Sequence, residues 1–324
     1  MLDDYQQVAA DMADWSLAGP DIELTSLDRH IDEEAELAAT LAGVPVVVAM
    51  RERTRFTPSL FDALPDLKLL VTTGPFNAAI DMEAAAAHGV TLCGTGGLIT
   101  PTSELTWALI LAVLRRIPAD DADMRAGLWQ RNVGTGLQGQ RLGLLGLGRL
   151  GALVAKVGLA FGMDVVAWSA NLTPEKCAEA GVGYVSRDEL FASSDVVSIH
   201  LVLGPRSRGL VGRTELAAMK PTAVLVNTSR GPIVDEAALI DALQNGTIAG
   251  AGLDVFDQEP LPPDHPLRTL SNTVVTPHVG YVTRQTYEIF YRDIVNDIRA
   301  WRDGAPIRLV TPGPRRRRRS GGSR

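Results

Sequence analysis

The sequence predicts an α/β fold with two doubly wound domains, and two observations support this prediction. Short apolar runs rich in valine and leucine alternate with segments of helical composition along most of the chain. Buried parallel strands have this pattern because helices cover both faces of their sheet. The chain also has 324 residues, whereas a single core stops growing at roughly 250 to 300 residues. We therefore expect two domains with separate cores.

The first domain is expected to comprise residues 1–97 and to be completed by residues 283–312. Segments such as "DMEAAAAHG" have helical composition, and residues 283–303 have helical spacing that would return the chain to this domain. The strands expected here are the apolar runs at 43–50, 67–73 and 89–95.

A long helix at 100–118 is expected near the start of the second domain, which comprises residues 98–282. Thr102 or Ser103 would cap this helix and Pro118 would end it. Because the helix is apolar on all sides, we expect it to be buried between domains or subunits. The strands that would form the doubly wound sheet of this domain are 141–148, 164–170, 195–203, 223–229, 248–256 and 272–280.

A glycine-rich turn follows the first strand of the second domain. In "LLGLGRLG", Gly146, Gly148 and Gly151 form a G-x-G-x-x-G pattern that also includes Arg149 and Leu150. Glycines allow a tight turn, a close approach to a pyrophosphate and close packing of helix on strand, while the phosphates rest on the helix N-terminus. The pattern alone is weak, but the surrounding strand, helix and second strand favour dinucleotide binding over a structural turn.

Charged residues follow three later strands of the same domain. Arg230, Asp254 with Glu259, and His278 all come after apolar runs. Ligands of open α/β sheets bind beyond the carboxyl ends of the strands, so these side chains are expected to share one crevice with the cofactor. Each residue alone has an ordinary alternative: a surface or capping arginine, a solvated glutamate or a structural histidine.

Taken with their flanking sequences, these residues resemble those of the D-isomer-specific 2-hydroxyacid dehydrogenases, a family that includes glyoxylate/hydroxypyruvate reductases and phosphoglycerate dehydrogenases. The resemblance implies a Rossmann NAD(P)-binding domain inserted into a flavodoxin-like substrate domain. It also implies an enzyme that interconverts 2-oxoacids and D-2-hydroxyacids, and a homodimer formed through the cofactor domain. The segments that carry the resemblance are "TGPFNAAID", "ELTWALIL", "GLGRLG", "VSIHLVLGPRSRGLV", "NTSRGPIVDE", "GLDVFDQEPLPPDHPL" and "TPHVG".

The resemblance also implies roles for individual residues. Arg230, Glu259 and His278 would be catalytic, Arg230 and His278 would contact the substrate, and Asp254 would bind the nicotinamide amide. The substrate carboxylate would lie on the backbone of Gly74, Pro75, Phe76 and Asn77. The other expected cofactor contacts are Ser169, Asn171, Thr173, His200, Thr228 and His278.

The chemistry of 2-oxoacid reduction explains these residue types. A hydride must come from the cofactor and a proton must reach the carbonyl oxygen. His278 is the natural proton donor because imidazole exchanges protons near neutral pH. Glu259, if it bonds the other ring nitrogen, would favour the imidazolium, and the planar guanidinium of Arg230 can hold the substrate carboxylate.

The choice between NAD(H) and NADP(H) stays undecided. The strand end "VVAWSAN", residues 165–171, lacks the carboxylate that would bind the ribose hydroxyls and repel a 2'-phosphate, and Ser169 stands near that place. NADP-preferring relatives add an arginine beside this serine, where the chain has Ala170. Asn171, Thr173 and Lys176 are neutral or distant donors, so we expect weak discrimination.

The chain departs from the family in two ways. The family's first domain begins with a full strand before the "LDDYQ" segment, whereas this chain starts at Met1, so we expect a clipped strand or a different start. Phe76, with Leu98 and Tyr281, suggests that the pocket tolerates an apolar substrate side chain and hence a larger 2-oxoacid.

The same residues also bear on functions other than that of a 2-hydroxyacid dehydrogenase. A nucleotide-sensing, corepressor-like regulatory scaffold of the same fold is the alternative from another class. Formate dehydrogenase is disfavoured because such relatives pair the histidine with glutamine rather than with a residue like Glu259, while a phosphite-oxidising relative stays open. Loops that motifs do not define determine the substrate.

Composition and charge limit the partners of the protein. Hydrophobic residues make up 46% of the chain, and no apolar run approaches the roughly 18 residues of a membrane span. The net charge of -7 argues against nucleic acid, although residues 313–324 hold five consecutive arginines, Arg315 to Arg319. We expect this segment to be a disordered tail or an expression tag rather than a nucleic-acid arm. The N-terminus is acidic, and Cys93 and Cys177 lack metal-ligand spacing, so we expect a cytoplasmic protein without a metal site or membrane partner.

Overall fold

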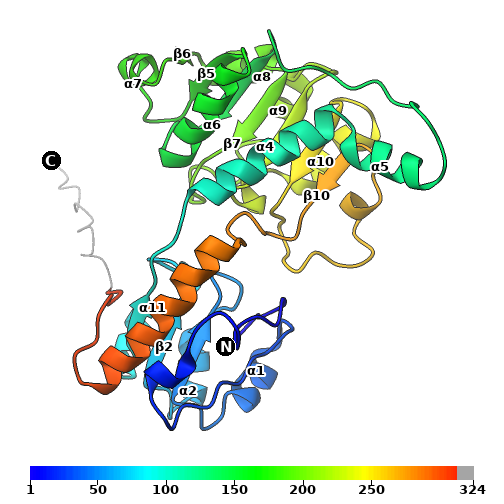
Figure 1. Cartoon of the computed structure of the whole chain (residues 1–324). Coiled ribbons are helices and arrows are strands. Elements are labelled where there is room, and N and C mark those ends of the chain that lie inside the picture. The colour runs from blue at the N-terminus through cyan, green and yellow to red at the C-terminus, as the bar shows by residue number, and fades with distance from the viewer. Residues whose placement is uncertain (312–324) are drawn as a thin grey trace, which may run out of the picture. The chain divides into compact units, whose positions relative to one another are not determined.

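A computed structural model describes residues 1–311 of the protein (Figure 1). The predicted basic tail at 313–324 lies outside the described residues. The described residues divide into two compact units, one formed by Met1–Leu98 with residues 283–311 and the other by Ile99–Val282. Each unit has a parallel sheet with helices around it, so the predicted α/β class is confirmed.

The first unit contains a three-stranded parallel sheet whose strands lie in chain order. All four residues of the central strand are buried, as expected for a strand covered on both faces. The strands are β1 (Val46–Ala49), β2 (Leu69–Thr72) and β3 (Thr91–Gly94). The helices are η1 (Trp15–Ala18), α1 (Glu34–Thr40), α2 (Pro58–Ala63), α3 (Met82–Ala87) and α11 (Arg284–Arg302).

The beginning of the chain lies beside β1 without forming a strand. The Leu2 N–H donates to the Val48 carbonyl over 2.9 Å, and the Leu27 N–H donates to the Met1 carbonyl. Leu2 is buried in the same hydrophobic core as Val47. One backbone hydrogen bond therefore joins the start of the chain to the sheet.

The second unit contains a seven-stranded sheet in the order β10-β9-β8-β7-β4-β5-β6, and every pair is parallel. The chain runs from β4 outward to β6 and then returns to β7 beside β4, so the strand order reverses there. The carboxyl ends of all strands lie at one edge, and ligands of such sheets bind at the reversal. The strands are β4 (Arg141–Leu145), β5 (Asp164–Trp168), β6 (Gly183–Tyr184), β7 (Val196–Ile199), β8 (Val224–Asn227), β9 (Gly250–Leu253) and β10 (Thr273–Val275).

Most strands of the second unit are shorter than predicted, and β6 was not predicted. The sequence analysis continued each strand into the residues that follow it, whereas in the structure these residues form the loops after the strands. The helices of this unit are α4 (Thr100–Leu114), α5 (Ile117–Arg125), α6 (Arg149–Ala160), α7 (Pro174–Glu179), α8 (Arg187–Ser193), α9 (Arg213–Ala218), η2 (Gly231–Ile233), α10 (Glu236–Gln244) and η3 (Pro266–Arg268).

The single helix predicted at 100–118 is wrong in its cap and in its end. Ile99 is the N-cap residue and provides no side-chain bond. The Thr102 hydroxyl donates instead to the Gly280 carbonyl, and the Ser103 hydroxyl to the Thr100 carbonyl. At the other end, Arg116 adopts a left-handed conformation with φ 53° and separates α4 from α5. Pro118 therefore lies in the first turn of α5, where its missing N–H breaks no helical bond.

Helix α4 packs on β8 and β9 of its own sheet. The Leu109 side chain lies so close to Gly252 that a Cβ there would be 3.0 Å from the Leu109 Cβ. The Thr106 and Thr228 hydroxyls are joined by a buried 2.8 Å hydrogen bond. This packing fixes the end of β8, which leads into the predicted catalytic loop. Within residues 1–311, no helix has the length and apolar character to cross a membrane.

Candidate active site

The predicted glycine-rich turn joins β4 to α6, and Gly146 and Gly151 each have a separate structural reason to be glycine. Gly146 has φ +103°, and a Cβ there would lie 2.6 Å from the His200 carbonyl oxygen. A Cβ at Gly151 would lie 2.2 Å from the Gly146 oxygen, so the helix could not pack this closely with any side chain there. At Gly148 the Cβ position has no atom within 4 Å and faces open space.

The N-terminus of α6 fits a dinucleotide pyrophosphate. Gly148 is the N-cap residue, and no side chain of the described chain caps this helix. The first backbone N–H groups of a helix have no partner within the helix and lie at the positive end of its dipole. Arg149 and Leu150 occupy the first turn, with Arg149 exposed and Leu150 half-buried. An anion can therefore reach these N–H groups without contacting a side chain at Gly148.

The loop after β5 contains only neutral side chains in its first residues. Ser169 follows the strand directly and is half-buried, while Ala170 and Asn171 are exposed. The Thr173 hydroxyl accepts a hydrogen bond from the Lys176 N–H and so caps α7. The strand end therefore presents neither a carboxylate nor a cation at Ser169 to Thr173.

His200 and Thr228 hold the ends of two central strands. The His200 N–H donates to the Leu145 carbonyl, and its Nε2 lies 2.9 Å from the Ser198 hydroxyl. Desolvation lowers the pKa of His200 to about 4, so its imidazole is neutral at physiological pH. Thr228 is bonded to α4 through Thr106. Both predicted cofactor residues lie at the carboxyl edge of the sheet, and both have a partner within the protein.

His278 and Glu259 form the central hydrogen-bonded pair of the site. His278 Nδ1 lies 2.5 Å from Glu259 Oε2, and the other carboxylate oxygen accepts a 2.9 Å hydrogen bond from the Phe256 N–H. Burial alone would raise the pKa of Glu259, but the hydrogen bond and charge of His278, the Phe256 N–H and the charge of Arg230 together lower it below its ordinary value. Glu259 is therefore ionised at neutral pH and can support a protonated imidazole.

Asp254 has a structural role that the sequence analysis missed. One carboxylate oxygen accepts hydrogen bonds from the Thr276 hydroxyl at 2.6 Å and the Val279 N–H at 2.8 Å, and the other accepts one from the Gly280 N–H at 2.9 Å. Burial raises the pKa of Asp254, and these bonds oppose that effect. The carboxylate thus holds the turn that carries His278. The only signal for this role in the sequence was the presence of an aspartate and of a turn with small residues.

The backbone of His278 is strained at the centre of this turn. Its φ is 53°, a left-handed conformation that costs a residue other than glycine about 1 to 3 kcal/mol. The three bonds to Asp254 from residues on both sides of His278 keep the turn in this conformation. The geometry presents the imidazole to Glu259.

Arg230 lies in the loop after β8, beside this pair. The side chain of Asn227 donates to the Arg230 carbonyl over 2.9 Å, and Arg230 Nη1 donates to the Ser229 carbonyl over 2.7 Å. The Ser229 hydroxyl in turn donates to the Leu201 carbonyl. The loop is thereby joined to the neighbouring strand end. The charge of Arg230 helps to lower the pKa of Glu259, the carboxyl group that faces His278.

The predicted carboxylate-binding loop lies in the first unit, after β2. Gly74 has φ +88°, and its N–H donates to the Thr95 hydroxyl. The buried Asn77 amide donates to the Arg51 carbonyl and the Thr72 hydroxyl, so it braces the loop from within. Pro75 and Phe76 are exposed. Among the described residues, the backbone N–H groups of Phe76 and Asn77 have no hydrogen-bond partner.

Comparison with known proteins places these features in a family. The model of the D-isomer specific 2-hydroxyacid dehydrogenase NAD binding domain matches residues 107–280. A glyoxylate reductase of Aeropyrum pernix is 43% identical over 242 residues, which cover 72% of this chain and 72% of that protein. A D-3-phosphoglycerate dehydrogenase of Mycobacterium tuberculosis is 39% identical over 264 residues, which cover 80% of this chain and 50% of that protein. The crystal structure of a phosphoglycerate oxidoreductase from Vibrio cholerae has a TM-score of 0.89 and 34% identity, covering 94% of this chain and 98% of that one.

The fold and the site define an oxidoreductase with a Rossmann-type cofactor domain. The chain belongs to the D-isomer-specific 2-hydroxyacid dehydrogenase family. The predicted family, fold class, enzyme class and use of an NAD-type cofactor are confirmed. The relatives named above are enzymes, and none supports the alternative of a regulatory scaffold.

Proposed function

We propose that this enzyme reduces a small 2-oxoacid, of the glyoxylate or hydroxypyruvate type or somewhat larger, to the D-2-hydroxyacid. The observation that carries this proposal is the 2.5 Å contact between His278 Nδ1 and the ionised Glu259. With Nδ1 engaged by Glu259, Nε2 is the ring nitrogen that can donate a proton to a carbonyl oxygen. The names of the Aeropyrum pernix and Thermococcus litoralis relatives, both glyoxylate reductases, support the substrate class.

Each residue of the site has one task in this reaction. The bound nicotinamide supplies the hydride. His278 donates the proton, Glu259 supports its protonated form, and the guanidinium of Arg230 binds the substrate carboxylate and polarises the carbonyl. The first unit would serve as the substrate domain, with the N–H groups of Phe76 and Asn77 as donors to the same carboxylate.

The cofactor would lie along the carboxyl edge of the seven-stranded sheet. The uncapped N-terminus of α6 supports a pyrophosphate site, and the loop after β5 supports a ribose site. Three protein donors already bind the Asp254 carboxylate. The nicotinamide amide would therefore bind only to the acceptor capacity that these donors leave. The proposed contacts are Gly146, Gly148, Arg149, Leu150, Gly151, Ser169, Asn171, Thr173, His200, Thr228, Asp254 and His278.

Phe76 supports a pocket that accepts an apolar substituent on the 2-oxoacid. Its side chain is 51% exposed in the loop whose backbone would bind the carboxylate. An exposed aromatic side chain beside polar donors is typical of small-molecule sites. Substitution of Phe76 by alanine should raise KM for phenylpyruvate more than for glyoxylate.

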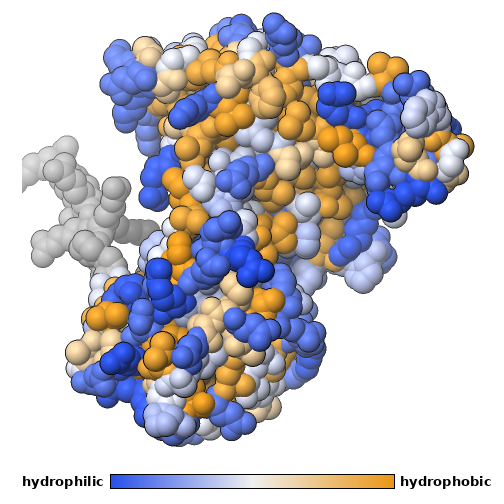
Figure 2. All heavy atoms as spheres, in the orientation of Figure 1, coloured by the Kyte–Doolittle hydropathy of each residue, from blue (hydrophilic) through white to orange (hydrophobic). Residues whose placement is uncertain are grey.

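We also propose a homodimer formed through the cofactor unit. Figure 2 shows apolar surface along α4 of this unit, and helix α5 with the segment after it exposes large apolar side chains, including Trp129 at 71% and Val133 at 94%. Contiguous apolar surface of this kind marks protein interfaces. Light scattering after gel filtration should give a dimer, and Trp129→Asp should weaken it.

A cytoplasmic location is part of this proposal, supported by two free, buried cysteines.

Steady-state oxidation of NADH and NADPH with glyoxylate, hydroxypyruvate and phenylpyruvate tests the proposed function. The account expects turnover of at least one pair within the usual range of about 1 to 1,000 per second. Turnover with none of them, by protein that binds NADH, would remove the proposed substrate class.

A further inference from the structure

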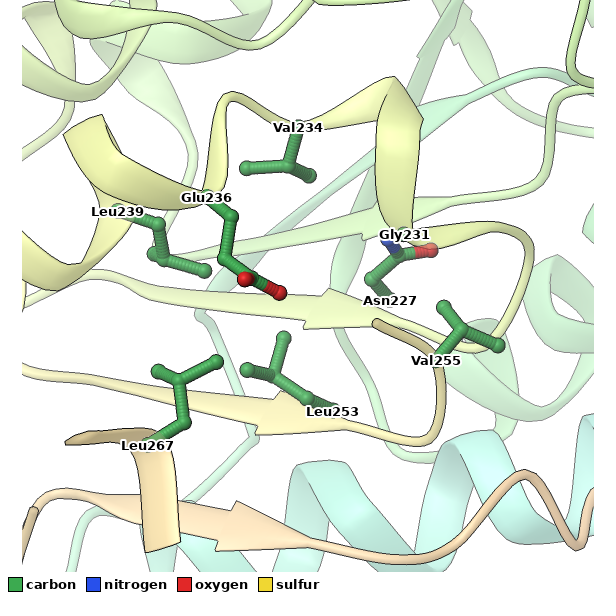
Figure 3. A pocket seen from close by; sticks show the side chains of 8 residues that line it. All are labelled: Asn227, Gly231, Val234, Glu236, Leu239, Leu253, Val255 and Leu267. Atoms are coloured by element: carbon green, nitrogen blue, oxygen red, sulfur yellow. The ribbon is translucent and has the colours of Figure 1, made fainter. Parts of the chain in front are cut away.

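Glu236 begins helix α10, directly after the loop that carries Arg230. Figure 3 shows its carboxylate pointing into a small pocket lined largely by apolar side chains, among them Leu239, Leu253 and Leu267. Only 19% of the side chain is exposed. A carboxylate in such surroundings is costly unless it is hydrogen-bonded or paired. The partners of Glu236 therefore indicate what it does.

Both oxygens of this carboxylate bind the loop between β9 and β10. Oε2 accepts a hydrogen bond from the Asp257 N–H over 3.2 Å, and Oε1 lies 3.1 Å from His265 Nε2. Because His265 Nδ1 accepts from the Leu267 N–H, Nε2 is the nitrogen that carries hydrogen and donates to Glu236. Asp257 and His265 lie at the two ends of the part of this loop that precedes η3, residues 256–265. One carboxylate thus ties both ends.

The loop that Glu236 holds in this way contains Glu259. The Phe256 N–H donates to Glu259 Oε1, so the backbone at 256–257 orients the carboxylate that faces His278. On the other side, this backbone touches the Arg230 loop, because a Cβ at Gly231 would lie 2.1 Å from the carbonyl carbon and oxygen of Phe256. The two loops with the charged site residues are therefore packed backbone against backbone next to Glu236.

We propose that Glu236 is a positioning residue, which holds the 256–265 loop against the Arg230 loop and thereby keeps Glu259 in the orientation that supports His278. Glu236 does not act on substrate or cofactor. Its effect passes through Glu259, and this inference rests on the role proposed for the His278–Glu259 pair.

Several charged groups surround this contact. Glu236 faces His265 and Asp257, with Asp235 beside it at the helix N-cap. Desolvation and the charge of Glu236 raise the pKa of Asp257, and the charge of Arg208 only partly offsets this increase. Glu259 faces His278 and Arg230, and the charge of His278 also acts on Asp254. The test must therefore separate an effect through Glu259 from a general change in this charged region.

Glu236→Gln is the test variant because it conserves size. In glutamine an NH₂ donor group replaces one of the two carboxylate oxygens, so the Asp257 N–H and His265 Nε2 no longer each have an oxygen of their own to donate to. We expect kcat for 2-oxoacid reduction to fall about tenfold, part of the 10²- to 10⁴-fold that positioned proton transfer contributes. The alkaline limb of the kcat profile should move to lower pH, while KM for NADH should change less than about twofold.

Asp235→Ala is the matched control on the same helix terminus. Asp235 caps α10 by accepting from the Ala238 N–H over 3.0 Å, and among the described residues it forms no hydrogen bond to the 256–265 loop. Its removal should lower the melting temperature by about 2 to 4 °C and leave the alkaline limb in place. If Asp235→Ala moves the limb as far as Glu236→Gln does, loosening of the helix explains the effect and the proposal fails.

The Glu259→Gln background separates the two levels of the account. If Glu236 acts through Glu259, then Glu236→Gln should produce no further shift of the limb in this background. A further shift of the same size would overturn the positioning role. If Glu259→Gln itself leaves the alkaline limb of the kcat profile unchanged, the result contradicts the proposed function of the His278–Glu259 pair. A limb that responds to Glu259→Gln but not to Glu236→Gln contradicts the positioning role alone.

Discussion

The two ends of the seven-stranded sheet's carboxyl edge differ in how their polar groups are held. At β8 to β10, Asp254 has three donors within the protein and Glu259 has two partners, His278 and the Phe256 N–H. At β5, Ala170 and Asn171 are exposed, and Ser169 is a neutral side chain. At the β8 to β10 end, the polar side chains are hydrogen-bonded within the protein. At the β5 end, the side chains are available to a ligand. From this difference we expect the site residues to determine the reaction strongly and the β5 loop to discriminate only weakly between NADH and NADPH.

The largest effect is expected at the organised end. His278→Ala removes the proposed proton donor, and kcat should fall at least about 1,000-fold, within the range for general acid catalysis. The NADH dissociation constant, measured by fluorescence titration, should stay within about threefold of wild type because His278 is not expected to hold the pyrophosphate or the adenosine. Substantial residual turnover would remove His278 from the role of acid.

Glu259→Gln should have a smaller effect and a defined direction. Reduction requires protonated His278, and the Glu259 carboxylate stabilises the imidazolium by charge, whereas an amide does not. The alkaline limb of the reduction profile should therefore move to lower pH in the variant. We expect kcat at neutral pH to fall about 10- to 100-fold. An unmoved limb would contradict the proposed role of Glu259.

Ala170→Arg tests the open end. An arginine beside Ser169 supplies a cation for a 2'-phosphate, so the ratio of kcat/KM for NADPH over NADH should rise about 10- to 100-fold, or roughly 1.4 to 2.8 kcal/mol. Ala170→Gln is the neutral control of similar length and should change the ratio little. In wild type, a preference above about 1,000-fold for one cofactor would show that this loop discriminates more strongly than its side chains indicate.

The smallest effect is expected in the first unit, where a buried carboxylate contrasts with Asp254. Asp297 is fully buried, and its charged partner is Arg308 at 3.0 Å. Burial raises the pKa of Asp297 to about 7, against the charge of Arg308. The unfolded carboxyl has a pKa near about 3.9, so the folded protein binds more protons between these values. Stability should fall as pH rises from about 4 to about 7.

Asp297→Asn should reduce this pH dependence. An amide does not ionise, so the variant's melting temperature should fall less between pH 5 and pH 8 than that of wild type. Asp303→Asn, at the exposed C-cap of the same helix, is the control and should keep the wild-type slope. Equal slopes for wild type and Asp297→Asn would contradict the assignment.

Features that depend on short segments could be predicted from the sequence. The α/β class follows from alternating apolar runs, and the turn at Gly146 and Gly151 follows from steric requirements that only glycine meets. The break after α4 could not be predicted, because Arg116 has no intrinsic preference for the left-handed conformation that it adopts. Pro118 was the local signal of a break near this point, but it lies in the first turn of α5 and does not end α4.

The contacts that organise the site join segments far apart in the chain. Asp254 binds the turn around His278, and Glu236 binds Asp257 and His265. The sequence indicated the charged residues at the strand ends but not which donor each carboxylate would accept from. Such pairings depend on the strand order β8-β9-β10, which a single sequence does not determine.

The most direct test of the central claim follows a labelled hydrogen. The enzyme should be supplied with NADH carrying deuterium at the transferred position of nicotinamide C4, together with hydroxypyruvate, and the product analysed by mass spectrometry and chiral chromatography. The account predicts D-glycerate with one deuterium on C2 and no such product with His278→Ala. Unlabelled glycerate, or the L-isomer, would contradict direct hydride transfer to a 2-oxoacid at this site.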